Sequence, residues 1–392
     1  MSSSTTHIWI EEPVGLNEET TYSAVIEAPN KERQTLWFKI PSKHAHLAVC
    51  SLDAFAVANI FLLMKEGFDC RFHGNLSPSL LRNLSEFQSA WQVWRPERYK
   101  QIEIIPDSQC EETVAHERTN AIAAFSGGVD STHTIYRHTI GSCPKPWKRE
   151  IKSGLFVHGF DIPLSAPDAF ERAVKPIEST LAAVGIDLIT MSTNLQAMNI
   201  EWDDTHIAGL ASTLMFFKNN FNEGLVASGC AYNGLVLPWG SNPITDHLLS
   251  SKNFGIVHDG ASVKRAEKIR QLTQWSDGYD NLRICFSAEK RDENCGICAK
   301  CVMDILLTRF HGIPQSKAIP ELTDAKLAVL NIPTPHQIAA FDNVARAAKE
   351  KGITDPWVRI LETRLKEQKK AQSNGAKPAP RFSALLKRII SG

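Results

Sequence analysis

The feature that most constrains the fold of this chain is an apolar strand pattern that runs directly into a glycine turn and a helix pattern. Residues 121–125 read Ala-Ile-Ala-Ala-Phe, and residues 126–131 read Ser-Gly-Gly-Val-Asp-Ser. Gly127 and Gly128 have no side chains, so backbone N–H groups can approach an anion there, and the following helix directs its positive end at the same point. The segment therefore predicts a phosphate-binding loop at the carboxyl end of a buried strand.

Three side chains of this loop can take part in binding a phosphate or its magnesium ion. The hydroxyl groups of Ser126 and Ser131 can donate hydrogen bonds to phosphate oxygens. Asp130 has the same sign of charge as a phosphate, so we expect it either to order the loop or to hold a magnesium ion shared with pyrophosphate. A plain strand-to-helix turn is the alternative, because serine, glycine and aspartate are common turn and cap residues. The string lacks the Gly-x4-Gly-Lys-Ser/Thr pattern, which argues against γ-phosphate transfer by a P-loop NTPase.

Apolar runs suited to buried parallel strands recur after residue 120 and alternate with helix patterns. They lie at 121–125, 155–157, 188–191 and 225–227. Strands separated by helices imply βαβ units with right-handed crossovers. We therefore predict an α/β fold with an open, mainly parallel sheet and flanking helices.

The rest of the chain divides by pattern into further regions. Residues 1–115 mix alternating runs with one helix pattern and predict an N-terminal α+β accessory domain. Residues 116–312 form the predicted α/β domain with the phosphate-binding loop and the cysteine cluster, and residues 313–370 predict a helical extension. Residues 371–392 combine a linker composition with a short basic amphipathic helix pattern.

Charge and hydropathy exclude several classes of function. The 43 basic and 43 acidic residues cancel, so the whole chain lacks the charge surplus that would attract nucleic-acid phosphates or anionic lipid. Residues 1–6 do not read as a signal peptide, and no apolar stretch approaches the length of a bilayer span. We expect a cytoplasmic protein without a membrane partner.

Four of the nine cysteines crowd into one segment, with the spacing Cys285-x9-Cys295-x2-Cys298-x2-Cys301. Four thiolates are enough to close a tetrahedral zinc shell without water, so the site would be structural. An iron–sulfur cluster is the competing interpretation. The odd cysteine count and the lack of a signal peptide argue against a disulfide framework.

The loop and the cysteine cluster together resemble a known family. Their order and spacing are similar to those of the 7-cyano-7-deazaguanine synthases, which are PP-loop ATP pyrophosphatases, over residues 120–312. The resemblance implies that ATP adenylates the carboxylate of a 7-deazaguanine acid and that ammonia then gives the amide. A second ATP-dependent step would give the nitrile, while zinc would hold the fold.

The resemblance also implies ligand residues by position. The ATP and magnesium set is Phe125, Ser126, Gly127, Gly128, Asp130 and Ser131, and the zinc set is Cys285, Cys295, Cys298 and Cys301. Where the family has Asp-Cys-Arg-Pro-type and Lys-Ala-Glu sequences, this chain has residues 239–246 and 265–267. Relatives with altered substrate segments occur in bacterial anti-phage gene clusters, so the resemblance extends to defence-associated members that act on a modified base or a protein.

The segment 240–260 follows the fourth predicted strand and is too rich in small, polar and ionisable residues to be a core element. Open α/β sheets bind ligands beyond the carboxyl ends of their strands. We therefore expect Asp246, His258 and Asp259 to orient substrate, accept a proton from an amine or coordinate magnesium. A surface loop with local caps is the alternative.

Arg265 and Lys268 lie one turn apart on a predicted helix and can neutralise charge on an adenylate or on pyrophosphate. A solvated helix face is the alternative. Three polar residues after the second and third strands can line the same cleft: His158, Asp161 and Asn194. His206, at the start of an apolar helix, is interpreted as a cap or a core residue.

These features predict an ATP-dependent carbon–nitrogen ligase that adenylates a carboxylate or amide and uses ammonia or another amine as nucleophile. One alternative is a tRNA-modifying PP-loop transferase, which would bind nucleic acid and use a reactive cysteine such as Cys230. The other is an ATP-binding adaptor in a defence system without turnover. The expected partner is a small-molecule acid or a modified protein, and a homodimer is left open.

Overall fold

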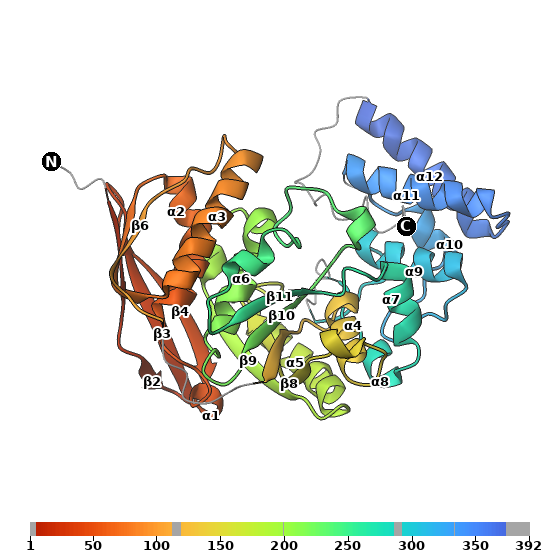
Figure 1. Ribbon diagram of the computed structural model, residues 1–392. Coiled ribbons are helices and arrows are strands. Elements are labelled where there is room, and N and C mark those ends of the chain that lie inside the picture. Colours follow the sequence, from red (N-terminus) through yellow and green to blue (C-terminus); the bar gives the residue numbers. More distant parts are fainter. Residues whose placement is uncertain (1–4, 112–118, 199, 286–291, 333, 374–392) are drawn as a thin grey trace.

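The computed structural model describes residues 5–111, 119–198, 200–285, 292–332 and 334–373. Within these residues, eleven strands form one mixed sheet, and helices pack along it (Figure 1). The architecture confirms the predicted α/β class, with an open, mainly parallel sheet and flanking helices.

The carboxyl-terminal half of the sheet is parallel throughout and contains the predicted loop. Its strands lie in the order β11-β10-β7-β8-β9. Their bounds are Asn120–Ala124 (β7), Glu150–His158 (β8), Asp187–Thr193 (β9), Glu223–Ala227 (β10) and Gly255–Asp259 (β11). From β7, the chain extends the sheet to one side with β8 and β9, then returns to place β10 and β11 on the other. The strand order therefore reverses between the neighbours β7 and β10. Open α/β sheets bind ligands at such a switch point, beyond the carboxyl ends of the strands.

The strand β11 corrects the prediction of a polar loop over 240–260. It lies at the edge of the sheet, where it pairs with β10 alone among the described strands. Asp259 at its end is 7% exposed and accepts hydrogen bonds from Thr134 Oγ1 (2.8 Å) and Arg137 Nη1 (3.2 Å). Both donors belong to α4 (Val129–His138). Asp259 is tolerated in this strand because the neighbouring helix supplies its partners.

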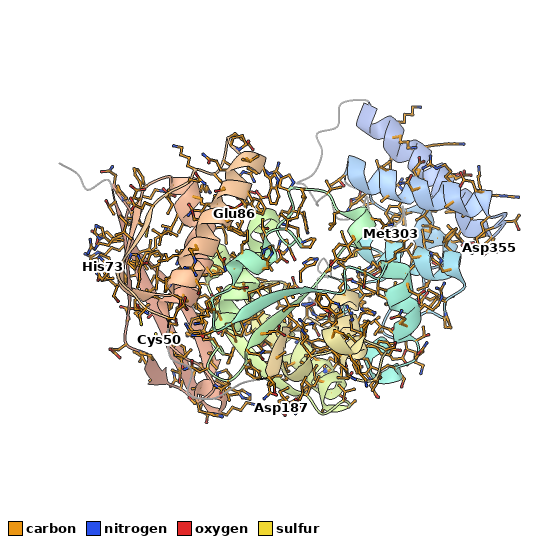
Figure 2. All side chains as sticks on the ribbon, in the orientation of Figure 1. Cys50, His73, Glu86, Asp187, Met303 and Asp355 are labelled. Carbon is orange, nitrogen blue, oxygen red and sulfur yellow. The ribbon has the colours of Figure 1, made fainter. Side chains whose placement is uncertain are left out.

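Alternate residues of the central strands face two separate cores. Ile122 packs in a core that includes residues of α6 (Trp202–Met215). Its neighbour Ala121 faces a second core, which includes α9 (Ala299–His311) and its residue Met303. Figure 2 shows the side chains packed on both sides of the ribbon, with Met303 labelled. Burial on both faces explains why these strands read as continuous apolar runs.

The amino-terminal region continues the same sheet. Its strands are Thr6–Ile10 (β1), Val14–Leu16 (β2), Glu19–Glu27 (β3), Gln34–Pro41 (β4), Cys70–Leu76 (β5) and Ile104–Gln109 (β6). β4 pairs with β9 in an antiparallel register that opposes Phe38 to Thr193. The side chain of Asn194 accepts a hydrogen bond from Trp37 N (2.9 Å) and donates one to Thr35 O (2.8 Å). Backbone pairing therefore joins the predicted accessory domain to the half of the sheet that carries the loop after β7.

A buried ion pair also joins the two halves. The amino-terminal helices are Ser42–Ala45 (α1), Leu52–Glu66 (α2) and Pro78–Trp94 (α3). Asp53, in the first turn of α2, lies 2.9 Å (Oδ2 to Nζ) from Lys218, which follows α6. Their side chains are 1% and 2% exposed. Ser77 donates two hydrogen bonds to the same carboxylate, from its N (3.0 Å) and its Oγ (2.7 Å).

Replacing Asp53 with alanine is expected to lower the free energy of unfolding by about 3–5 kcal/mol, because it leaves the Lys218 ammonium buried without its carboxylate. The double variant Asp53→Ala/Lys218→Met is expected to lose less than the sum of the two single changes. Urea unfolding of the four proteins measures both quantities. The matched control is Asp342→Ala, whose exposed pair with Lys369 is expected to contribute less than about 1 kcal/mol. A loss from Asp53→Ala as small as the control's would contradict the account.

The remaining helices of the described chain pack into the second core (Figure 1). They are Pro167–Ala182 (α5), Arg265–Leu272 (α7), Ser276–Tyr279 (α8), Asp324–Ala328 (α10), Pro335–Glu350 (α11) and Pro356–Ser373 (α12). Single turns of 3-10 helix lie at Lys145–Trp147, Leu195–Met198, Tyr232–Gly234 and Asp246–Leu249. The terminal amphipathic helix predicted over 382–390 lies outside the described residues. Within the described chain, every helix is too short or too polar to cross a bilayer.

Candidate functional site

The loop between β7 and α4 has the shape that its two glycines permit. Gly127 has φ +73°, a left-handed conformation that side chains disfavour. A Cβ atom there would lie 3.3 Å from Ile177 Cγ1 and 3.5 Å from Arg283 Cβ. Gly127 O also accepts a hydrogen bond from Arg283 N (2.8 Å). Packing on one side therefore fixes the loop backbone.

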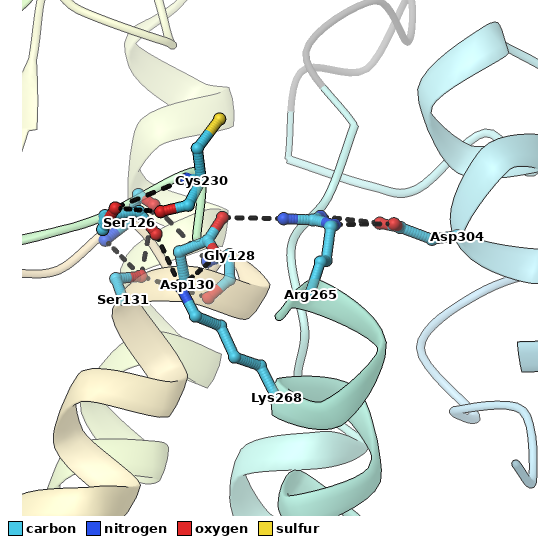
Figure 3. Close-up of polar contacts among 9 residues, drawn as sticks. Ser126, Gly128, Asp130, Ser131, Cys230, Arg265, Lys268 and Asp304 are labelled. Atoms are coloured by element: carbon cyan, nitrogen blue, oxygen red, sulfur yellow. Dashed lines mark hydrogen bonds and ion pairs between the residues drawn. The ribbon is translucent and has the colours of Figure 1, made fainter. Parts of the chain in front are cut away.

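The loop leaves anion-binding groups available. Gly128 is the N-cap residue of α4 and supplies no side-chain cap, so N–H groups of the first helical turn keep their capacity to bind an anion. Ser126 N and Ser126 Oγ each lie 3.3 Å from Ser131 Oγ (Figure 3). These internal contacts are long for hydroxyl hydrogen bonds, so both hydroxyls can turn toward a phosphate with little loss.

Asp130 lies at the centre of a network of charges (Figure 3). Its Oδ2 is 2.7 Å from Arg265 Nη1, and its Oδ1 is 2.9 Å from Lys268 Nζ. Arg265 also forms a two-point pair with Asp304 of α9, at 2.8 Å from Nε to Oδ1 and from Nη2 to Oδ2. Lys268 donates to Ser228 O (2.6 Å), beyond the end of β10. The network links the loop to α7, α9 and the switch point.

The charges of this network stabilise one another. Burial alone would raise the pKa of Asp130, but the Lys268 ammonium and the Arg265 guanidinium outweigh it and lower that pKa to about 2. Burial opposes the charge of Arg265, whereas the carboxylates of Asp304 and Asp130 raise its pKa. Both oxygens of Asp130 are engaged, so its observed role is to order the two cations against the loop. Binding of magnesium by Asp130 would require one of these ion pairs to open.

A cavity of about 880 Å³ opens beside this loop and reaches the ends of β8 and β10. That volume falls within the range of small-molecule sites, about 300–1,000 Å³. At one end, its wall consists of loop residues and charged side chains, including Ser126, Arg265, Lys300 and Asp304. The cavity therefore meets the proposed phosphate-binding groups directly.

The other end of the cavity is lined by aromatic rings and α6. Phe160 and Trp202 lie with ring centroids 4.8 Å apart, and His206 and Trp239 with centroids 5.4 Å apart. All four line the cavity, together with the carboxylate of Asp203. Burial raises the pKa of Asp203, and nearby His206 offsets part of that effect. This end suits a flat, partly polar organic group.

The four clustered cysteines come together as their spacing predicts. Their sulfur atoms all lie within 4.8 Å of one another. Cys285 Sγ is 3.5 Å from Cys295 Sγ and 3.7 Å from Cys298 Sγ, and Cys295 Sγ is 4.0 Å from Cys301 Sγ. Metal–sulfur distances of about 2.3 Å in a regular tetrahedron require sulfur–sulfur edges of about 3.8 Å. The cluster therefore fits a zinc ion, and Cys295 and Cys298 also line the cavity.

Asn294 holds the segments that carry these cysteines. Its Oδ1 accepts hydrogen bonds from Ile284 N (2.7 Å) and Cys285 N (3.0 Å). Its Nδ2 donates to Leu282 O (2.7 Å) and Ala318 O (2.8 Å). One side chain thus ties the backbone around Cys285 and that of Ala318 to the position next to Cys295. This role was not predictable from the sequence, because the amide binds backbone groups that only the fold brings near.

Asp246 and His258 lie behind the cavity wall. Asp246 is 0% exposed, and its Oδ2 lies 2.7 Å from His258 Nδ1. The same carboxylate accepts hydrogen bonds from Ser241 Oγ (2.7 Å) and Asn242 N (2.7 Å). Of this group, Ser241 lines the cavity. Asp246 and His258 therefore shape the loop that carries Trp239 and Ser241, and the geometry favours the capped-loop alternative over direct substrate contact.

The remaining predicted residues divide between the cavity and the scaffold. Asp161 lines the cavity, and its Oδ2 is 3.6 Å from Nη1 of Arg283, a guanidinium that is 5% exposed beside the loop. His158 is buried, stacks on Phe170 with ring centroids 4.6 Å apart and lies 2.9 Å (Nε2) from Pro163 O. His158 thus belongs to the scaffold, as does Asn194 at the β4–β9 junction.

Three further residues of the cavity wall were not predicted from the sequence. Asp304 and Lys300 lie on α9 next to the cysteine cluster, and Trp239 lies in the segment between β10 and β11. His206 was interpreted as a cap or core residue, but its ring lines the cavity. Lys300 and Asp304 lie within three residues of Cys301 in the sequence, and this short spacing was the signal that could have predicted them as site residues.

No family model matches this chain, and no curated protein or solved structure matches it either.

Proposed function

We propose that this chain is an ATP-dependent carbon–nitrogen ligase of the PP-loop class, which adenylates a substrate carboxylate and transfers the acyl group to an amine. The observation that carries the proposal is the loop at the β7–β10 switch point, where the amino terminus of α4 has no side-chain cap. The loop opens into a cavity with room for a nucleotide and an acid. A loop of this kind binds phosphate groups through backbone N–H groups and the helix dipole.

The two ends of the cavity suit the two reactants. The β- and γ-phosphates of ATP would bind the N–H groups of the loop and the hydroxyls of Ser126 and Ser131. Arg265 lines this end and is held by Asp130 and Asp304. Because its position is fixed before the reaction, it can stabilise the charge that develops on departing pyrophosphate. The acid would lie at the aromatic end, near Trp202 and Trp239.

The proposed reaction has two steps. A carboxylate oxygen attacks the α-phosphorus, the bond from that phosphorus to the bridging oxygen of pyrophosphate breaks, and an acyl adenylate forms. The amine nitrogen then attacks the acyl carbon, loses a proton and displaces AMP. Binding both reactants in one cavity supplies much of the rate, because the reacting atoms are held in place.

Zinc and magnesium would have separate parts in this proposal. Four cysteine thiolates would fill the zinc shell, so zinc would support the wall formed by Cys295 and Cys298 without contacting substrate. Magnesium would accompany ATP through its phosphate oxygens and keep several waters, as is usual for this ion.

Pyrophosphate release from ATP tests the proposal. We expect release to depend on an added acid, with 7-carboxy-7-deazaguanine plus ammonium as the first pair because of the resemblance described above. Asp130→Asn is expected to lower the rate by about 100-fold, since Arg265 and Lys268 lose the carboxylate that positions them. Asp324→Asn, an exposed aspartate in the first turn of α10, is the control and should leave the rate unchanged.

Other outcomes identify other functions. Pyrophosphate release that ignores this acid would keep the class and change the substrate. Tight ATP binding without any release would favour the adaptor. Dependence on tRNA would favour the transferase, although Cys230 points its sulfur away from Ser126 and Asp130 in Figure 3.

A further inference from the structure

We infer that His206 is a catalytic base of the second step, which takes the proton from the attacking amine through its Nε2 atom. The inference rests on the proposed function, because it assigns a residue to the aminolysis of an acyl adenylate. It begins from the position of His206 in the aromatic wall of the cavity that also contains the loop.

The hydrogen bond of the ring fixes its tautomer. His206 Nδ1 lies 3.1 Å from Trp202 O, one turn earlier in α6. A carbonyl oxygen can only accept, so Nδ1 must carry the hydrogen, and a neutral ring then has its lone pair on Nε2. The Asp203 carbonyl is a second backbone acceptor for the ring, and it lies with Nδ1 beside Gly240. The hydrogen bonds of the described residues include none at Nε2, and Nε2 is not one of their fully enclosed atoms without a partner. The lone pair is therefore available to a ligand in the cavity.

The ring is also held in place. A Cβ atom on Gly240 would lie 2.3 Å from His206 Cε1, so the loop backbone packs directly on the imidazole. Trp239 lies beside it on the same loop. The first turn of α6 is anchored from the amino-terminal region, because Arg98 Nη1 lies 2.7 Å and Tyr99 Oη 3.1 Å from Asp204 Oδ2. Such preorganisation is what a proton acceptor needs.

The surroundings keep the ring neutral near pH 7. Burial lowers the pKa of His206, and the backbone carbonyls of Trp202 and Asp203, together with the carboxylates of Asp246 and Asp203, offset only part of this effect. Of these carboxylates, Asp246 is enclosed and engaged by its own loop. Asp203 also lines the cavity. We assign the proton to His206 because its ring is held in place with Nε2 open to the cavity, and the variant Asp203→Asn tests the carboxylate separately.

The step balances without another reactant. The amine nitrogen forms a bond to the acyl carbon, Nε2 accepts one proton from that nitrogen, and the bond from the acyl carbon to the AMP oxygen breaks. The products are the amide, AMP and a protonated His206, which returns its proton to water.

The test separates adenylation from amine capture. His206→Asn keeps a side-chain N–H for Trp202 O and removes the base. With 7-carboxy-7-deazaguanine, we expect the exchange of labelled pyrophosphate into ATP to stay within about 3-fold, while amide formation with ammonia falls about 100- to 10,000-fold. Capture by hydroxylamine, whose nitrogen is unprotonated at neutral pH, should fall less than about 10-fold, and added imidazole should restore part of the ammonia rate. Asp203→Asn should keep amide formation within about 10-fold.

Two results would overturn the assignment. One is amide formation by His206→Asn at the unaltered rate. The other is an equal fall in exchange and in capture of both nucleophiles, which would show a structural role. If the unaltered protein lacked acid-dependent exchange, the proposed function would fail first and the assignment with it. If His206→Asn kept both the exchange and the capture of ammonia, the assignment of His206 would be wrong while the proposed function would stand.

Discussion

Replacement of Cys301 with serine is expected to release the bound metal and to lower the melting temperature by about 10 °C or more. Cys301 is 0% exposed in the first turn of α9, whose apolar side packs in the second core. Structural zinc sites contribute about 10–16 kcal/mol of apparent binding free energy in small domains. At an unfolding entropy of about 2.1 cal/mol/K per residue, the lower of these figures corresponds to about 12 °C in a chain of 392 residues. The same change should abolish ATP binding, because the cluster forms part of the cavity wall.

Metal analysis, calorimetry and nucleotide titration of one preparation check this result. We expect one zinc ion per chain in the unaltered protein and none in Cys301→Ser. Cys110→Ser is the matched control, because Cys110 is an exposed free cysteine outside the cluster, and it should change none of the three quantities. Full metal content and unchanged melting in Cys301→Ser would contradict the structural role.

Substitution of Arg265 by methionine is expected to lower the rate of AMP formation by about 100- to 1,000-fold, the range seen when one preorganised donor of an anionic site is removed. The change also leaves the Asp304 carboxylate without its two-point partner and Asp130 with Lys268 alone. Arg265→Lys keeps the charge but loses the fork, so it should retain the fold and recover only part of the rate.

Single-turnover measurement of AMP, with saturating ATP, tests this expectation. Arg270→Met is the matched control, because Arg270 lies on the same helix, 50% exposed, and pairs with exposed Glu267. It should leave the rate within about 2-fold. Equal rates in Arg265→Met and Arg270→Met would remove Arg265 from the proposed site.

The fold was predictable wherever local pattern determines structure. The apolar runs over 121–125 and 225–227 became β7 and β10 within about two residues. The pairing of β4 with β9 was not visible, because it depends on residues more than 150 positions apart, such as Phe38 and Thr193. Local sequence carries no signal for that contact.

The same distinction applies to the site. The Ser126 loop and the cysteine cluster lie within short segments, so the spacing of their residues was enough to predict which side chains come together. The burial of Asp246 depends on hydrogen bonds from Ser241 and Asn242, which form only when the loop folds. The position of His206 depends on the approach of Gly240, some thirty residues later. Chemistry could be predicted from residue type, but access to the cavity could not.

The most direct test of the central claim identifies which anhydride bond of ATP this chain breaks. ATP labelled on its α-phosphate would be incubated with the protein, magnesium, ammonium and 7-carboxy-7-deazaguanine, and the labelled products separated by chromatography. The account predicts labelled AMP, in amounts equal to pyrophosphate, and its loss in Arg265→Met. Labelled ADP with free phosphate would contradict it, because that result requires attack on the γ-phosphorus and a different use of the Ser126 loop.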